Sequence, residues 1–176
     1  MTPTVDQRRR RLAGFSLIEL LIVVAIILII AAIAIPNLMR SKMAANESSA
    51  VGSMRSIVTA ETAYASSWGL GYAQDLTSLG SSAPGACTAT STNACLLDDL
   101  LTSGTKSGYS FAAAGNTATN GVYSGFEANG TPLAVGQSGQ RAFCADQSGV
   151  IRFNTTGTAI GTSAGNCAAQ SILVGN

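Results

Sequence analysis

The longest apolar run of the chain lies close to the N-terminus. Residues 15–35 consist of Phe, Leu, Ile, Val and Ala apart from two polar positions, Ser16 and Glu19. A helix that crosses a bilayer needs about 20 apolar residues, so this run predicts a membrane-spanning helix that is apolar on all faces. A carboxylate inside such a helix costs about 2.5–3.5 kcal/mol at the membrane centre and less near the interface. Glu19 therefore needs a cationic partner.

After Pro36 the apolar residues become periodic. They recur mainly at spacings of three, four and seven as far as Trp68, and polar residues occupy much of the opposite side, which is typical of an amphipathic helix. Proline lacks a backbone N–H, and inside a membrane or a packed bundle it kinks a helix more often than it ends one. We therefore predict that residues 36–68 continue the helix, with a kink at Pro36. The stripe expected to pack beneath a sheet comprises Met39, Met43, Ala50, Val51, Met54, Ile57, Val58, Ala65 and Trp68.

The rest of the chain changes from helical to alternating periodicity. Residues 69–106 are rich in Ser, Thr, Ala and Gly and predict a loop region with one short helix at residues 95–101. From residue 107 onward apolar and polar positions alternate, and residues 146–149 resemble a hairpin connection. Residues 107–176 therefore predict three or four antiparallel strands and a C-terminal loop. The expected fold class is α+β, with the long helix packed against one face of a small antiparallel sheet, whose other face meets solvent or neighbouring subunits.

The net charge of +1 is unevenly distributed along the chain. Residues 1–14 carry Arg8–Arg11 and Asp6, a net charge of +3, so the remainder nets −2. This slightly acidic remainder gives no indication of a surface for nucleic acid. Basic residues directly before an apolar helix stay in the cytoplasm, so the C-terminus is expected on the far side of the membrane.

The chain has no histidine and four cysteines. Without histidine, Ser-His-Asp and Cys-His catalysis, histidine zinc sites and haem attachment are excluded, and we expect no metal or other cofactor. The cysteines lie in the part expected to be exported, where disulfides persist. Four cysteines allow three pairings that the sequence does not distinguish. We favour the two local ones, Cys87–Cys95 and Cys144–Cys167.

A short motif joins the basic N-terminal residues to the apolar helix. It consists of Gly14-Phe15-Ser16-Leu17-Ile18-Glu19, followed by the apolar segment and Pro36. In these residues and their spacing, the first third of the chain resembles the type IV pilin family, which includes the pseudopilins of secretion systems. The resemblance implies that residues 1–14 are a prepilin leader peptide, cleaved between Gly14 and Phe15. It also implies N-methylation of the new α-amine of Phe15.

The resemblance gives Glu19 a role in assembly. In a filament its carboxylate would neutralise the Phe15 amine of an adjacent subunit and set the axial stagger. Within one chain the same amine lies about one helical turn away, so an internal pair is also open. Unpaired charges are costly in the low dielectric of a helix bundle, which favours a paired role for Glu19.

The implied function is structural, not enzymatic. The prepilin would be held in the inner membrane with its N-terminus in the cytoplasm and processed by the prepilin peptidase/methyltransferase. An inner-membrane assembly platform would then polymerise it with copies of itself into an extracellular type IV pilus. Two alternatives stay open: a pseudopilin of a type II secretion system, and a membrane-tethered binding domain that never polymerises. The tethered domain would need neither Glu19 nor the Gly14–Phe15 junction.

Overall fold

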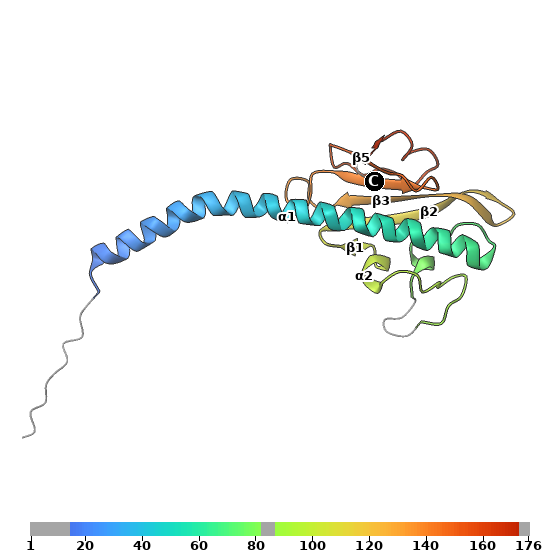
Figure 1. Cartoon of the computed structure of the whole chain (residues 1–176), viewed down its shortest axis with the longest axis horizontal. Helices are drawn as coiled ribbons and strands as arrows, with labels where there is room; N and C mark the ends of the chain where they lie inside the picture. Colours follow the sequence, from blue (N-terminus) through green and yellow to red (C-terminus); the bar gives the residue numbers. More distant parts are fainter. Residues whose placement is uncertain (1–14, 82–86, 173–176) are drawn as a thin grey trace, which may run out of the picture. The chain divides into compact units, whose positions relative to one another are not determined.

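The computed structural model describes residues 15–81 and 87–172. Within these ranges the fold is α+β, with one long helix and a six-stranded antiparallel sheet, which confirms the predicted class (Figure 1). Helix α1 runs from Leu17 to Trp68 and continues through Pro36. Contacts divide the chain into two units, Met1–Leu38 and Met39–Asn176. The first unit holds the wholly apolar part of α1, and the second holds its amphipathic part and the sheet.

The strands of the sheet lie side by side in sequence order, and each pairs with the next in antiparallel fashion. The two longest strands, β2 (Tyr109–Thr119) and β3 (Val122–Pro132), form a hairpin. The alternating pattern placed strands within β2, β3 and the next two strands, but not the two-residue strands, which are too short to show a period. The remaining strands are β1 (Thr105–Lys106), β4 (Ala142–Asp146), β5 (Ile151–Asn154) and β6 (Ser171–Ile172).

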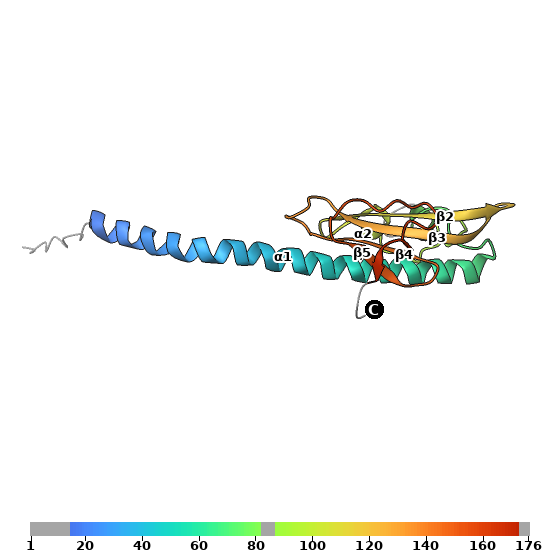
Figure 2. The ribbon, with the colours of Figure 1, turned by 90° about the horizontal axis from the view of Figure 1, so that it is seen from above.

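The main core lies between the second part of α1 and one face of the sheet. Figures 1 and 2 show this part of the helix running along the sheet. Burial alternates along the start of β2, so that one face meets the helix, as the period of two predicts. From the predicted stripe, Ala50, Met54 and Ile57 are buried, whereas Met39 is 47% exposed. The largest buried side chains of this core include Tyr109, Phe126, Phe143, Met54, Ile57, Leu79, Leu101 and Ile151.

The second face of the sheet is covered at β4 by the C-terminal loop. Ala142 and Cys144 face away from α1 and form a separate buried cluster with Ile160 and Cys167. The expectation that this face meets solvent or other subunits is therefore wrong at β4. The disulfide Cys144–Cys167 attaches the loop to the strand, and the Asn129 side chain donates to the Ile160 carbonyl at 2.5 Å. The alternating pattern could not show this, because the loop has no period of its own.

Three glutamates are buried in the Met39–Asn176 unit. Glu47 accepts two bonds from the Arg141 guanidinium, at 2.9 and 2.7 Å, and two from backbone N–H groups. Glu61 accepts from the Ala73 N–H at 2.8 Å. Glu127, on β3, accepts from the backbone N–H groups of two loop residues after Ile160. Each side chain thus joins its own helix or strand to another segment of the fold by hydrogen bonds, as buried polar groups require.

The loop region between α1 and the sheet holds two short helices. Residues Thr77–Leu79 form a 3-10 helix, and α2 spans Asp99–Thr102. The predicted helix at residues 95–101 therefore starts too early. Asp98 caps α2 by accepting the Leu101 N–H at 3.0 Å, and Cys95 has a φ of 59°, which no right-handed helix allows.

Candidate functional site

The N-terminal turn of α1 carries the polar groups of the predicted site. Phe15 precedes the helix and is 75% exposed, and Leu17 is the first helical residue. The Glu19 carboxylate turns back and accepts the backbone N–H of Ser16 at 2.9 Å. This is one arm of a capping box, in which a glutamate in the first turn satisfies an amide that has no helical partner. A negative charge here also complements the positive end of the helix dipole.

The side chains around this turn form an apolar surface. None of residues 15–38 is buried, and Leu17, Leu20, Leu21, Val24 and Leu28 line a shallow groove along the helix. Among the described residues, α1 is the helix that is long and apolar enough to cross a membrane. Exposed leucines and isoleucines of this density are stable in lipid or against other helices, and not in water.

Pro36 lies inside the apolar part of α1. Its missing N–H leaves one backbone acceptor of the preceding turn without the usual helical bond. The Asn37 side chain donates to the Ile33 carbonyl at 3.1 Å, one position further along. This bond lies beside the acceptor that Pro36 frees, the Ala32 carbonyl, and does not satisfy it.

Within the described residues, Glu19 is held by its own turn. The ion pairs of the described residues are Lys106–Asp98 and Arg141–Glu47, so no basic side chain in those ranges pairs with Glu19. Its Oε2 accepts one hydrogen bond, and a carboxylate offers about four lone-pair positions. The arrangement can therefore accept a further donor, best a cationic one, at the start of an apolar helix.

The other predicted site residues are distributed along the chain. Gly14 and the rest of the proposed leader lie outside the described residues. The four cysteines belong to the Met39–Asn176 unit, where Cys87 is bonded to Cys95 and Cys144 to Cys167, the two local pairings favoured from the sequence.

Two features of the molecule were missed from the sequence. The spacing Ser16-x-x-Glu19 is the signature of a capping box and was available as a local signal. The anchoring role of Glu127 had no such signal, because its partners lie 38 and 40 residues away.

Comparison with known proteins finds a known family motif near the start of the chain. The model of the prokaryotic N-terminal methylation motif matches residues 9–35, which include Phe15, Glu19 and the apolar run. No curated protein and no solved structure matches the chain. The motif, the long apolar helix and the α+β fold agree with one another, and together they mark the chain as a type IV prepilin-like protein, of the pilin and pseudopilin kind.

Proposed function

We propose that the chain is the precursor of a type IV pilus subunit. Residues 1–14 are the leader, and cleavage between Gly14 and Phe15 by the prepilin peptidase/methyltransferase creates an N-methylated Phe15. The observation that carries the proposal is the matched motif, which places a single acid, Glu19, in the first turn of an exposed apolar helix. Before assembly that helix holds the precursor in the inner membrane, with its N-terminus in the cytoplasm.

Assembly exchanges lipid for neighbouring helices. The apolar surface of residues 15–35 gains little from this exchange alone, because lipid tails are as apolar as leucine. The charge pair supplies specificity: the Phe15 amine of one subunit meets the Glu19 carboxylate of the next, and each charge is then neutralised in a low-dielectric bundle. In the filament, residues 15–35 form the core, residues 36–68 support the sheet, and residues 69–106 and 107–176 form the outer part.

The C-terminal loop favours a pilus subunit over a pseudopilin of a type II secretion system. The major pseudopilins of type II secretion bind calcium in a C-terminal loop, and calcium needs several oxygen ligands. In this chain Glu127 gives both of its carboxylate oxygens to loop N–H groups, and the Cys144–Cys167 disulfide fixes the same loop covalently. The loop is thus held without a cation.

Fractionation of cells that produce the chain tests the proposal. We expect a sheared extracellular fibre in which mass analysis finds an N-terminus at methylated Phe15. A periplasmic pool would favour the pseudopilin, and monomer confined to membranes would favour the tethered domain. An intact Met1 terminus in the fibre would contradict the cleavage site.

A matched set of variants separates charge from capping. Glu19→Gln keeps an oxygen that can accept the Ser16 N–H but removes the charge, so we expect membrane insertion without fibres. Ile18→Ala changes the neighbouring exposed position without altering charge and should still assemble. Normal fibre yield from Glu19→Gln, with no wild-type subunit present, would refute the pairing role.

A further inference from the structure

A small cavity of 150 Å³ lies in the Met39–Asn176 unit beside the β2–β3 hairpin. Three of its walls are tyrosines, and amide and hydroxyl side chains provide most of the others. We call it the tyrosine pocket, after its residues Tyr64, Tyr72 and Tyr123, which are joined by Gln74, Ser78 and Ser91. Among the described residues that line it, none has a side chain that is charged at neutral pH. Its volume equals that of about five water molecules, enough for part of one small ring.

The fold fixes these walls through one strip of backbone. The Tyr72 N–H donates to the Tyr123 carbonyl at 2.9 Å, and the Gly115 N–H donates to the Gln74 carbonyl at 3.0 Å. Between them, Ala73 is fully buried and its N–H donates to Glu61 at 2.8 Å. Buried Ala73 thus lies between Tyr72 and Gln74, two residues that line the pocket. The packing of Ala73 in the core therefore fixes the positions of these two pocket residues.

Several polar groups at the pocket are available to a ligand. The Tyr64 hydroxyl is occupied, because it donates to the Ser91 carbonyl at 2.6 Å. Among the described residues, the hydroxyls of Tyr72, Tyr123 and Ser91 and the amide of Gln74 have no hydrogen-bond partner. These groups donate and accept, and the tyrosine rings beside them offer apolar surface.

We propose that the tyrosine pocket binds one neutral sugar ring, a function that goes beyond filament formation. A sugar ring has apolar C–H groups that pack on aromatic faces and hydroxyls that both donate and accept. The lining matches both needs and lacks the cation that a phosphate or carboxylate ligand requires. A quaternary ammonium also suits aromatic walls, but it makes no use of the free amide and hydroxyls.

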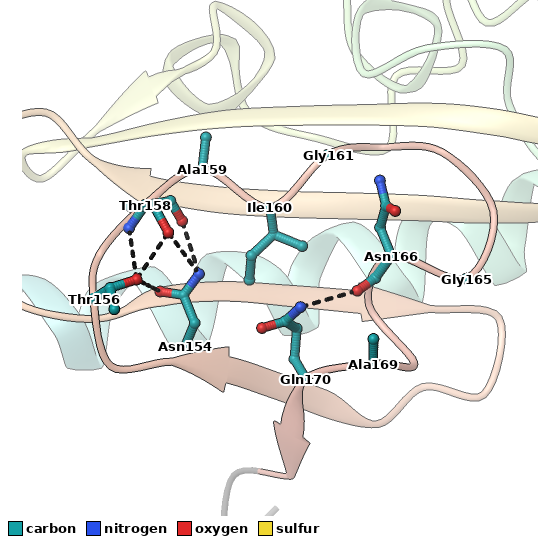
Figure 3. Close-up of a pocket in the computed structure, with 10 residues that line it drawn as sticks. All are labelled: Asn154, Thr156, Thr158, Ala159, Ile160, Gly161, Gly165, Asn166, Ala169 and Gln170. Carbon is teal, nitrogen blue, oxygen red and sulfur yellow. Dashed lines mark hydrogen bonds between the residues drawn. The ribbon is translucent and has the colours of Figure 1, made fainter.

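A larger polar cavity of 450 Å³, in the C-terminal loop, provides a comparison within the same molecule (Figure 3). It has no aromatic wall. Its amides are partly used by the loop itself: Asn154 donates to the Thr158 carbonyl at 2.9 Å, and Gln170 donates to the Asn166 carbonyl at 3.2 Å. The tyrosine pocket is therefore the better sugar site of the two.

Saturation-transfer NMR on the full chain tests the proposal, in a polyoxyethylene detergent that carries no sugar. The probes are free glucose, galactose, mannose and N-acetylglucosamine, up to about 50 mM, because one ring in a small pocket binds near the millimolar range. Tetramethylammonium is the probe for the aromatic-cage alternative. We expect at least one sugar to bind, and Tyr123→Leu and Gln74→Ala each to weaken that binding about tenfold. Gln170→Ala, in the C-terminal loop cavity, should not change it.

Each other outcome overturns the proposal. These are no sugar binding at the highest concentration, binding that survives both pocket variants, loss of binding in Gln170→Ala, or binding of tetramethylammonium alone. Because the Gln74 side chain is exposed, Gln74→Ala should fold normally, and this is checked by its thermal midpoint. The measurement uses unassembled protein, so its failure leaves the pilus proposal untouched.

Discussion

Replacing Glu61 with glutamine should remove a pH dependence of stability that the fold builds into the Met39–Asn176 unit. Glu61 is 0% exposed; its Oε2 accepts the Ala73 N–H, and its Oε1 has no partner among the described residues. Burial raises the pKa of Glu61 from 4.5 to about 7, the hydrogen bond from Ala73 opposes this rise, and the nearby charge of Asp75 adds to it.

The sign of the effect follows from proton binding. A raised pKa means that the folded state holds the proton more tightly than the unfolded state, so this stabilisation is complete below pH 4.5 and is lost as the pH rises through about 7. One pKa unit corresponds to about 1.36 kcal/mol, so the free energy of unfolding falls by at most about 3 kcal/mol across this window. The chain has no histidine, so no side chain with an ordinary pKa in this range adds to the change.

Denaturant unfolding of the full chain in micelles, between about pH 5 and 7.5, measures this slope. Trp68 is the single tryptophan and stacks on Tyr64 with ring centroids 5.1 Å apart, so its fluorescence reports on this region. Wild-type stability should fall with pH, whereas that of Glu61→Gln should stay level.

Glu47→Gln is the matched control, a buried glutamate on the same helix. Burial acts to raise the pKa of Glu47, but hydrogen bonds from Gln140 and Arg141 outweigh it and lower the pKa below 4.5. Its contribution is therefore present above pH 4.5 and lost only at lower pH, so the slope between pH 5 and 7.5 should match that of the wild type. Equal slopes in Glu61→Gln and wild type would refute the assignment to Glu61.

Three further changes test what stabilises the sheet. Glu47→Ala leaves the half-buried Arg141 guanidinium and two N–H groups without their acceptor, and should cost about 2–3 kcal/mol in denaturant unfolding; a loss below about 0.5 kcal/mol would contradict this. Cys144→Ser opens a loop of 23 residues in a buried cluster, whereas Cys87→Ser opens a loop of 8 residues at an exposed cysteine. Cys144→Ser should therefore lower stability by about 2 kcal/mol more than Cys87→Ser, and equal thermal midpoints would argue against this. Glu127→Ala should speed hydrogen exchange in the C-terminal loop at least tenfold while leaving β2 protected, and unchanged loop exchange would show that the disulfide alone holds the loop.

Periodicity was sufficient to predict the elements that are long and have one buried face. The second part of α1 and the start of β2 each repeat their pattern, so burial on one side leaves a signal in the sequence. The coverage of β4 by the C-terminal loop left no such signal in the sequence, because β4 is buried on both faces and shows no alternation. Only Cys144 indicated that another segment would lie there.

The buried glutamates show more clearly what a local sequence pattern cannot predict. Glu47 lay among polar residues that the sequence assigned to the outer side of the amphipathic helix, yet it is 9% exposed. Its burial depends on Arg141, 94 residues away, and no local pattern around Glu47 contains that information. A charged residue on a helix indicates an exposed face only if no distant partner exists, which the sequence of one chain does not reveal.

The contrast between local and distant partners also applies to Glu19. Helix α1 contains three glutamates, and two of them accept hydrogen bonds from groups that the fold brings from 12 to 94 residues away. Glu19 is different: its partner in the structure is an amide three residues away, on a turn surrounded by exposed apolar side chains. A capping bond satisfies one acceptor position but does not neutralise the charge, and the cost of that charge grows when the apolar surface is covered. Covering the helix therefore favours a cationic partner for Glu19, and the N-terminal amine that the proposed cleavage creates, in the same chain or in a second copy, is the group that we propose for this role.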